Sequence, residues 1–367
     1  MKEKILITGG AGFIGSHTAD ALARQGYAIR ILDNLEPPVH KGNWPGYVKN
    51  KDYELMRGDV RRKEDWMKAL GGVKYVYHLA AYQDQRPDFS KFFGVNTVST
   101  ALLYEVILEK KLPIRKVILA SSQFVYGDGV YRCDHSGQIF YPELRPLAQL
   151  QKKKFDIKCP HGRAAYFVPF KEDQPIMPTN SYGLSKQALE NAALRFGKTY
   201  SIPTTIFRYS IVQGPRQSPR NLYSGALRIF VSQALAGVPL TVYEDGKETR
   251  DFVNVRDVVQ ANVLALKKSA TNFEIFNVGG GRAYPVLEFA KLVKHLTGSA
   301  SKITIGGFRR TDTRHAVSDI SKLKKIGWRP KYTPAEAVRD YVKWFREEGF
   351  EKKFNLHQLK SLGKGVG

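Results

Sequence analysis

A tyrosine and a lysine four residues apart are the first candidates for chemistry in this sequence. The run Ser181-Tyr182-Gly183-Leu184-Ser185-Lys186 opens a helix-like segment, so Tyr182 and Lys186 share one helical face. A tyrosine hydroxyl has a pKa of about 10, which is too high for a base at neutral pH. A lysine ammonium one turn away stabilises the phenolate, so the pair could take a proton from an alcohol while hydride leaves its carbon.

A serine pair at the end of a strand-like run is the second candidate. Residues Lys116–Ala120 are mostly apolar and lead into Ser121-Ser122-Gln123-Phe124-Val125-Tyr126-Gly127. Residues at the carboxyl ends of parallel strands face the ligand crevice. A serine hydroxyl there can hydrogen-bond a substrate oxygen as that oxygen changes between alcohol and ketone.

A glycine-rich loop near the N-terminus indicates a dinucleotide site. The loop Gly9-Gly10-Ala11-Gly12-Phe13-Ile14-Gly15 lies between a strand-like run, Lys4–Thr8, and a helix-like segment, Ser16–Arg24. Its glycines allow a tight turn, a close approach to a pyrophosphate and packing of the helix on the strand. The next strand ends at Asp33, whose carboxylate can bind ribose hydroxyls and repels a 2′-phosphate, so we expect NAD rather than NADP.

The elements that position these residues alternate between β-rich and helical patterns. Such alternation predicts a parallel sheet with helices on both faces. The further expected strands are Tyr27–Leu32, Tyr53–Met56, Tyr75–Leu79, Thr204–Arg208 and Ile275–Val278. The further expected helices are Asn96–Glu109, Tyr182–Tyr200, Tyr223–Ala236, Val255–Lys267 and Pro285–Leu296.

The domain organisation follows from where this rhythm breaks. Residues 128–180 are rich in Pro, Gly, aromatic and basic residues and have little periodicity, so we interpret them as an insertion. We expect a cofactor domain over 1–207 that carries this insertion, and a mainly substrate-binding domain over 208–350 from which 250–280 returns to the cofactor domain. Residues 351–367 form a basic tail that we expect to be poorly ordered.

Taken in order, the glycine loop, the Ser-Ser-x-x-Val-Tyr-Gly stretch and the Tyr-x-x-x-Lys pair resemble the extended short-chain dehydrogenases/reductases. Among these, the chain is similar to the nucleotide-sugar epimerases and dehydratases over about residues 4–346. The resemblance implies an α/β fold, with a Rossmann doubly wound parallel sheet and a smaller C-terminal α/β substrate-binding domain. It also implies Ser122, Tyr182 and Lys186 as catalytic residues. The cofactor-binding residues expected from the loop, the strand ends and the family pattern are Gly9, Gly12, Phe13, Ile14, Gly15, Asp33, Asn34, Asp59, Val60, Leu79, Ala80, Ala81, Asn96, Tyr182, Lys186 and Tyr209.

The residues after Ser122 favour one branch of this chemistry. Dehydratases of the family carry an Asp-Glu pair there, whereas this chain has Gln123 and Phe124, which do no acid–base work. We therefore expect an NAD-dependent nucleotide-sugar epimerase that acts at C4 of a hexose or deoxyhexose through a keto-sugar. Alternatives within the family are a 2-epimerase, a decarboxylase or a dehydratase. The alternative from another class is a catalytically retired RNA-binding or regulatory protein.

Arginines are the expected ligands of the substrate diphosphate, because a guanidinium binds phosphate in a bidentate way. Arg250 and Arg314 match positions where the family holds the diphosphate, and Arg216 is a third candidate. Gln83, after the fourth strand, and Ser122 are expected to contact the sugar. The family's substrate-contacting Asn is replaced by Ile211, so the identity of the sugar stays open.

A possible structural zinc site lies in the insertion. Cys133-Asp134-His135 and Cys159-Pro160-His161 each place a cysteine two residues before a histidine, and Cys133, His135, Cys159 and His161 could bind zinc tetrahedrally. The insertion resembles that of the dTDP-L-rhamnose 4-epimerase-like branch. The alternative is two buried free thiols with incidental histidines.

Composition limits the partners and the compartment. The 367 residues carry a net charge of +24, but the basic residues are dispersed, so we expect a solvated surface and no dedicated nucleic-acid binding. The two cysteines fit a reducing compartment, and the sequence has no long apolar run. We therefore expect a cytoplasmic protein without a membrane partner. Extra apolar positions on the helices at about 96–110 and 182–200 predict a homodimer.

Overall fold

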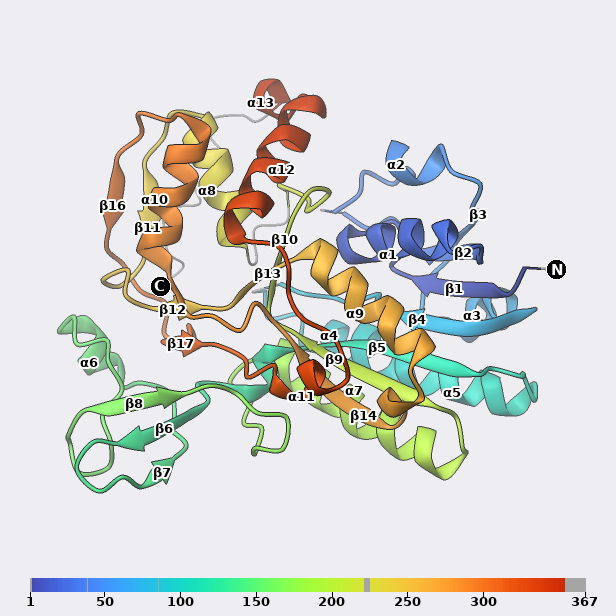
Figure 1. Cartoon of the computed structure of the whole chain (residues 1–367), viewed down its shortest axis with the longest axis horizontal. Coiled ribbons are helices and arrows are strands. Elements are labelled where there is room, and N and C mark those ends of the chain that lie inside the picture. Colours follow the sequence, from blue (N-terminus) through green and yellow to red (C-terminus); the bar gives the residue numbers. More distant parts are fainter. Residues whose placement is uncertain (1, 38, 85, 221–224, 354–367) are drawn as a thin grey trace.

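The computed structural model describes residues 2–37, 39–84, 86–220 and 225–353 (Figure 1). Within these residues, a seven-stranded sheet has the order β14-β9-β5-β4-β1-β2-β3, with every pairing parallel. Its strands are β1 (Lys4–Thr8), β2 (Ala28–Asp33), β3 (Glu54–Arg57), β4 (Val73–His78), β5 (Lys116–Ser122), β9 (Thr204–Tyr209) and β14 (Glu274–Val278). The predicted doubly wound parallel fold is therefore confirmed.

Successive side chains of the strands enter opposite cores. On one face, Ile5 and Ile7 of β1 pack with α1 (Phe13–Arg24) and α9 (Val255–Lys267). On the other face, Leu6 packs among α3 (Lys63–Ala69), α5 (Ser99–Glu109) and α7 (Ser181–Thr199). Burial on both faces explains the continuous apolar runs of the sequence. The segment expected as one helix over 96–109 begins with a π-helical turn, η1 (Phe93–Val98), before α5.

A second group of elements has its own apolar core and lies at the upper left of Figure 1. Its helices are α8 (Ala226–Leu235), α10 (Val286–Thr297) and α12 (Pro334–Glu347). Its short strands are β10 (Ile211–Gln213), β11 (Leu240–Val242), β12 (Thr249–Arg250), β13 (Phe252–Asn254), β15 (Tyr284–Pro285), β16 (Ile303–Ile305) and β17 (His315–Ala316). The expected helix Tyr223–Ala236 begins at Ala226 within the described residues, and 223–224 lie outside them. Most of the expected basic tail also lies outside.

The insertion folds into a small antiparallel sheet, at the lower left of Figure 1. Strand β6 (Val130–Cys133) lies between β7 (Ile139–Phe140) and β8 (Ala165–Val168). A short helix, α6 (Leu147–Gln151), lies between β7 and β8 in the chain. The insertion is thus more regular than its sequence pattern suggests, because its strands are too short to show an alternation.

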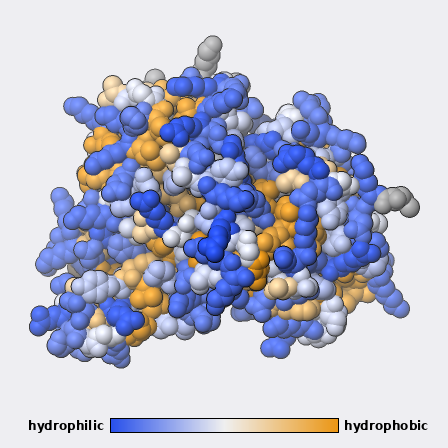
Figure 2. All heavy atoms as spheres, in the orientation of Figure 1, coloured by the Kyte–Doolittle hydropathy of each residue, from blue (hydrophilic) through white to orange (hydrophobic). Residues whose placement is uncertain are grey.

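The remaining short helices connect these layers. They are α2 (Gly46–Lys49), α4 (Phe89–Phe92), η2 (Gln123–Tyr126), η3 (Ser269–Thr271), α11 (Ser321–Lys325) and α13 (Phe350–Lys353). Among the described residues, no helix is both long enough and apolar enough to cross a membrane. Hydrophilic side chains cover most of the face drawn in Figure 2, as the large net charge suggests.

Candidate functional site

The glycine loop forms a close-packed turn between β1 and α1. Gly9 has a φ of +66°, and a Cβ there would lie 2.8 Å from Cα of Ala80. A Cβ on Gly15 would lie 2.3 Å from the carbonyl oxygen of Gly9. Side chains at these two positions would therefore force the turn and α1 apart. The backbone N–H groups at the start of α1 are left at the edge of a cavity, as an anion-binding site requires.

Asp33, at the end of β2, is tied to this loop. Its carboxylate accepts hydrogen bonds from the backbone N–H of Ala11 at 3.0 Å and of Leu35 at 2.9 Å. Burial raises the pKa of Asp33, while His40 and the two hydrogen bonds favour the charged form. The carboxylate is thus fixed beside the loop, where it fits the ribose of a dinucleotide.

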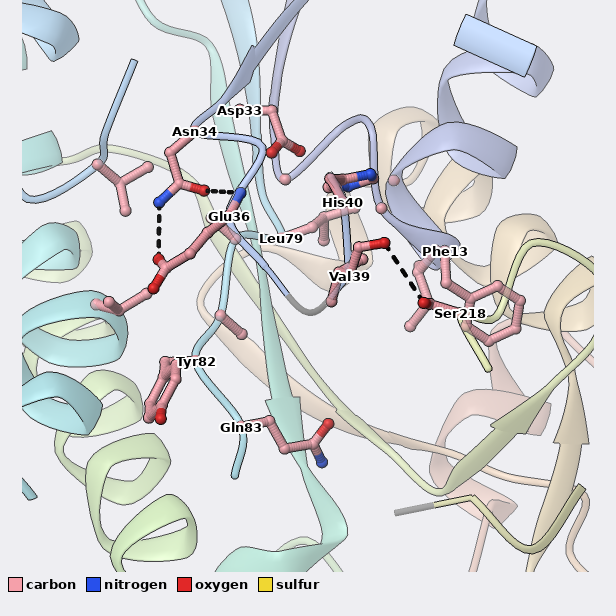
Figure 3. A pocket seen from close by; sticks show the side chains of 18 of the residues that line it. Phe13, Asp33, Asn34, Glu36, Val39, His40, Leu79, Tyr82, Gln83 and Ser218 are labelled. Carbon is pink, nitrogen blue, oxygen red and sulfur yellow. Dashed lines mark hydrogen bonds between the residues drawn. The ribbon is translucent and has the colours of Figure 1, made fainter. Parts of the chain in front are cut away.

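The cavity beside the loop and Asp33 has a volume of about 310 Å³. Figure 3 shows Asp33, Asn34, His40 and Gln83 around it. Thirteen predicted site residues line the cavity: Gly9, Gly12, Phe13, Ile14, Gly15, Asp33, Asn34, Asp59, Val60, Leu79, Ala80, Ala81 and Gln83. The structure therefore places these thirteen predicted residues around one cavity. Their contacts with a ligand remain predictions.

Asn34 and Asp59 form a polar corner of the same cavity. The side-chain amide of Asn34 donates to Glu36 at 3.1 Å and to Asp59 at 3.2 Å. Burial opposes ionisation of Asp59, but hydrogen bonds from Arg61 and Asn34 outweigh it and lower its pKa to about 2. Asp59 is therefore a carboxylate at any pH of interest.

Ser122 and Tyr182 meet where β5 ends and α7 begins. The Asn180 side chain caps α7 by accepting the N–H of Gly183 at 2.8 Å. A Cβ on Gly183 would lie 2.5 Å from the carbonyl oxygen of Phe124, so glycine lets the helix start against η2. Burial raises the pKa of Tyr182 to about 12, and a hydrogen bond with Ser122 partly offsets this effect.

Lys186 lies one turn further along α7 and is almost fully buried. Its Nζ donates to the carbonyl oxygen of Ala120 at 2.8 Å and lies 5.8 Å from the centroid of the Tyr182 ring. Burial lowers the pKa of Lys186 to about 7, while the charge of Glu190 raises it. The Ala120 carbonyl that Lys186 binds lies on β5, the strand next to β4, and the residues after β4 line the cavity.

Two predicted cofactor residues are buried in internal networks. Asn96 accepts the N–H of Tyr82 at 2.9 Å and donates to Ser185 on α7 at 2.9 Å. The Tyr209 hydroxyl donates to Asn262 at 2.6 Å. Neither residue is among those that line the described cavity, so both hold elements of the site in place and their cofactor contacts stay predictions.

The three predicted phosphate-binding arginines have different surroundings. Arg250 is half-buried, and no ion pair joins it to a carboxylate within the described part of the chain. Arg216 pairs with Asp20 at 2.8 Å and does not line the cavity, a placement that does not support its predicted role.

Arg314 is 1% exposed and is surrounded by carboxylates. Its guanidinium pairs with Asp156 of the insertion at 2.7 Å, and with Glu244 at 2.9 Å and Asp245 at 2.7 Å. These carboxylates occupy the donors that a diphosphate would need. The structure therefore favours a positioning role for Arg314, between the insertion and the second group of elements.

The structure brings three of the four predicted zinc ligands together. The Nδ1 of His161 lies 3.8 Å from Sγ of Cys133 and 3.9 Å from Sγ of Cys159. The fourth, His135, is exposed, and its ring centroid lies 6.0 Å from that of His161. Both cysteines are free thiols.

Sequence reasoning missed several residues of the cavity wall. Arg228 of α8 and Gln217 are buried and line the cavity, and Arg228 Nε and Nη2 have no hydrogen-bond partner among the residues that the structure describes. His40 also lines it, beside Asp33. No motif marks these residues, since they reach the site only through the packing of α8 and of the loop after β2.

The sequence is similar to those of known proteins over nearly its whole length. The sequence model of the NAD dependent epimerase/dehydratase family matches residues 5–146 and 158–279, and the gap lies within the insertion. The dTDP-L-rhamnose 4-epimerase of Burkholderia thailandensis is 31% identical over 353 residues, which cover 94% of this chain and 96% of that one.

Two solved structures share the fold. The UDP-glucose 4-epimerase of Thermotoga maritima with UDP-glucose has a TM-score of 0.76 and 29% identity, covering 94% of this chain and 99% of that chain. The Thermus thermophilus UDP-glucose 4-epimerase with NAD has a TM-score of 0.73 and 28% identity, with the same coverage of both chains. These relatives confirm the predicted class of nucleotide-sugar epimerases, and the chain belongs to the NAD-dependent epimerase/dehydratase family.

Proposed function

We propose that this protein is an NAD-dependent epimerase that inverts C4 of a nucleotide-linked hexose or deoxyhexose. The observation that carries the proposal is the meeting of Ser122, Tyr182 and Lys186 at the carboxyl end of β5. These three residues do not line the cavity at the glycine loop, but β5 is the strand next to β4, and the residues directly after β4 do line it. The tight glycine turn and the fixed Asp33 carboxylate fit NAD and disfavour a 2′-phosphate. The glycine loop and Asp33 would hold NAD, which would supply a reversible hydride acceptor for C4 of the sugar.

The side chains divide the proton transfer among them. Tyr182 takes the proton of the C4 hydroxyl and later returns one, and Ser122 hydrogen-bonds the same oxygen in both its alcohol and ketone states. Lys186 stabilises the phenolate form of Tyr182, and the carbonyl of Ala120 holds the Lys186 side chain in place. A positive charge nearby must lower the tyrosine pKa, because burial raises it to about 12 even with the opposing hydrogen bond from Ser122.

The second group of elements supplies the substrate grip. Its residues lie mainly within 208–350. Of the three predicted arginines, Arg250 alone forms no ion pair within the described residues, although its Nη1 donates to the carbonyls of Thr249 and Arg314, so we assign it the diphosphate. Gln83 lines the cavity, which supports the proposal that it contacts the sugar. The change from the family's Asn to Ile211 leaves one usual contact out, so we do not assign a particular sugar.

A panel of UDP-, dTDP-, GDP- and CDP-linked sugars, followed by NMR, tests this function. We expect inversion at C4 of at least one hexose or deoxyhexose without net consumption of NAD. Release of CO₂, or stoichiometric reduction of an added acceptor, would instead identify a decarboxylase or a dehydrogenase of the family. No stereochemical change in any sugar, with NAD bound, would overturn the proposal.

We further propose a homodimer that forms through α5 and α7. These helices pack together, and apolar side chains on and beside them remain exposed, including Val98 at 50% and Leu184 at 44%. Sedimentation velocity should give a dimer, and Leu184→Glu should weaken it. A monomer at micromolar concentration would refute this assembly.

The free thiols suggest the cytoplasm as the place of action.

A further inference from the structure

Each of the two cysteines of the insertion begins a tight turn, which spans five residues from Cys133 and four from Cys159. After Cys133, the N–H of Gly137 donates to the Cys133 carbonyl at 2.9 Å, and Gly137 has a φ of +68°. After Cys159, the N–H of Gly162 donates to the Cys159 carbonyl at 2.8 Å, and Gly162 has a φ of +72°. In each turn a glycine in the left-handed region reverses the chain, and a histidine follows the cysteine by two residues.

The sheet of the insertion brings the turns side by side. Cys133, at the end of β6, pairs with Ala165 at the start of β8, and the N–H of Asp134 donates to Ala164 at 3.1 Å. Cys159 lies on the strand-like segment that leads into β8, where Lys158 and Ala164 form a bridge. The two thiols, whose residues are 2% and 3% exposed, therefore face one another across the sheet end.

The distances between the candidate ligand atoms fit a tetrahedral metal ion. Zinc bound at about 2.3 Å to sulfur and about 2.0–2.1 Å to nitrogen places these ligand atoms about 3.6 Å apart. The measured distances from His161 Nδ1 are 3.8 Å to Cys133 Sγ and 3.9 Å to Cys159 Sγ, and all three atoms lie within 4.8 Å of one another.

We infer that Cys133, Cys159, His161 and His135 bind one structural zinc ion that closes the outer end of the insertion. His135 supplies the fourth ligand, because it lies in the Cys133 turn, is exposed and free to rotate, and has its ring 6.0 Å from that of His161. Thiolate with imidazole is a ligand set that selects zinc over calcium or magnesium. Four protein ligands leave no open position for catalysis, so the ion is structural.

Such an ion would complete the anchoring of the insertion. Its inner end is held by ion pairs to the second group of elements, Arg145 to Glu244 at 2.7 Å and Asp156 to Arg314 at 2.7 Å. Its outer end has only short strands and few buried apolar side chains. Metal binding contributes folding free energy where a small core cannot. This inference does not depend on the proposed reaction.

Metal analysis of the purified full chain tests the site directly. We expect about one zinc per chain by mass spectrometry of the metal content, falling to below about 0.2 in Cys133→Ser and Cys159→Ser. His135→Ala should keep the fold but release zinc to a chelating dye at least about tenfold faster than the wild type. His295→Ala, which changes an exposed histidine on α10, is the matched control and should retain zinc.

Three results would overturn the site. Wild-type protein that holds no zinc, even after incubation with zinc sulfate and gel filtration, would exclude it. Thiol titration of the denatured, unreduced protein should find two thiols per chain, and finding none would assign a disulfide instead. Release of zinc from His135→Ala at the wild-type rate would remove His135 from the ligand set. Cobalt substitution gives an independent readout, since a tetrahedral cobalt–thiolate site has a strong charge-transfer band.

Discussion

The cofactor loop is stabilised by contacts between residues that are close in the sequence. The insertion is stabilised by contacts with residues that are far away in the sequence. In the loop, Asp33 reaches Ala11 across 22 residues, and Gly15 packs on Gly9 within one turn. In the insertion, Arg314 reaches Asp156 across 158 residues. The first region is therefore specified by a local motif. The insertion depends on charged residues that are distant in the sequence and that the rest of the fold must bring together. We therefore expect mutations in the two regions to have different effects on cofactor binding and on stability.

The largest effect should come from Tyr182→Phe, which removes the proposed proton acceptor without changing the packing. We expect 4-epimerase activity to fall about 100- to 10,000-fold, while the melting temperature changes little. Tyr166→Phe, on exposed strand β8 of the insertion, is the matched control and should keep full activity. Substrate turnover by NMR and thermal unfolding measure the two quantities. Retained activity in Tyr182→Phe would show that a group other than Tyr182 accepts the proton.

Removing Arg314 should weaken the contact between the insertion and the second group of elements. Arg314→Ala removes one of the two arginines that pair with the buried Glu244, the other being Arg145, and breaking a buried ion pair costs up to about 3–5 kcal/mol of unfolding free energy. Urea unfolding measures this loss, and the exposed Arg282→Ala should show almost none. If Arg314 instead held the substrate diphosphate, KM would rise while the unfolding free energy stayed near that of the wild type.

Asp33→Ser should weaken the cofactor side without unfolding it. Loss of charged hydrogen bonds to ribose is expected to weaken NAD binding about 10- to 100-fold, and NADP should lose less because a repulsion is also removed. Calorimetric titration of cofactor-stripped protein gives both affinities. The exposed Asp52→Ser is the control. An unchanged NAD to NADP preference would show that Asp33 serves only the loop.

The smallest expected effect is a pH dependence that arises near Arg314. Burial, with the charge of Glu244, raises the pKa of Glu248 from its ordinary 4.5 to about 7, against the lowering effect of Arg250 and Arg314. The folded state therefore keeps a proton that the unfolded chain releases, so this contribution is full below pH 4.5 and is lost as the pH rises to about 7. In Glu248→Gln, the fall in unfolding free energy over this window should shrink by about 2 kcal/mol.

Urea unfolding at several pH values measures that slope. The exposed Glu347→Gln is the matched control, since its carboxyl lies on the surface of α12. A slope in Glu248→Gln equal to that of the wild type would show that another group titrates there.

The local sequence pattern predicted the strands and helices of the main sheet well. It predicted poorly the contacts of the insertion and of the second group of elements. The bounds of β1 and α9 agree with the sequence prediction, because both elements have a clear apolar period and clear ends. The predicted meeting of Ser122 with Tyr182 also follows from topology, since both lie at the carboxyl edge of the sheet. The partners of Arg314 and the place of Arg228 could not be read this way, because nothing local marks residues that meet only through packing.

The insertion begins six residues after Ser122 and ends just before Tyr182. A chain that leaves at Ser122 must return at Tyr182, whatever its length, because β5 and α7 fix both ends. Closing a longer loop costs only about 0.6 kcal/mol for each doubling of its length. The insertion could therefore be replaced by a segment of another length without moving β5 or α7. Its replacement by a shorter connection would remove the antiparallel sheet and its ion pairs to the second group of elements, while β5 and α7, which carry Ser122, Tyr182 and Lys186, stay in place.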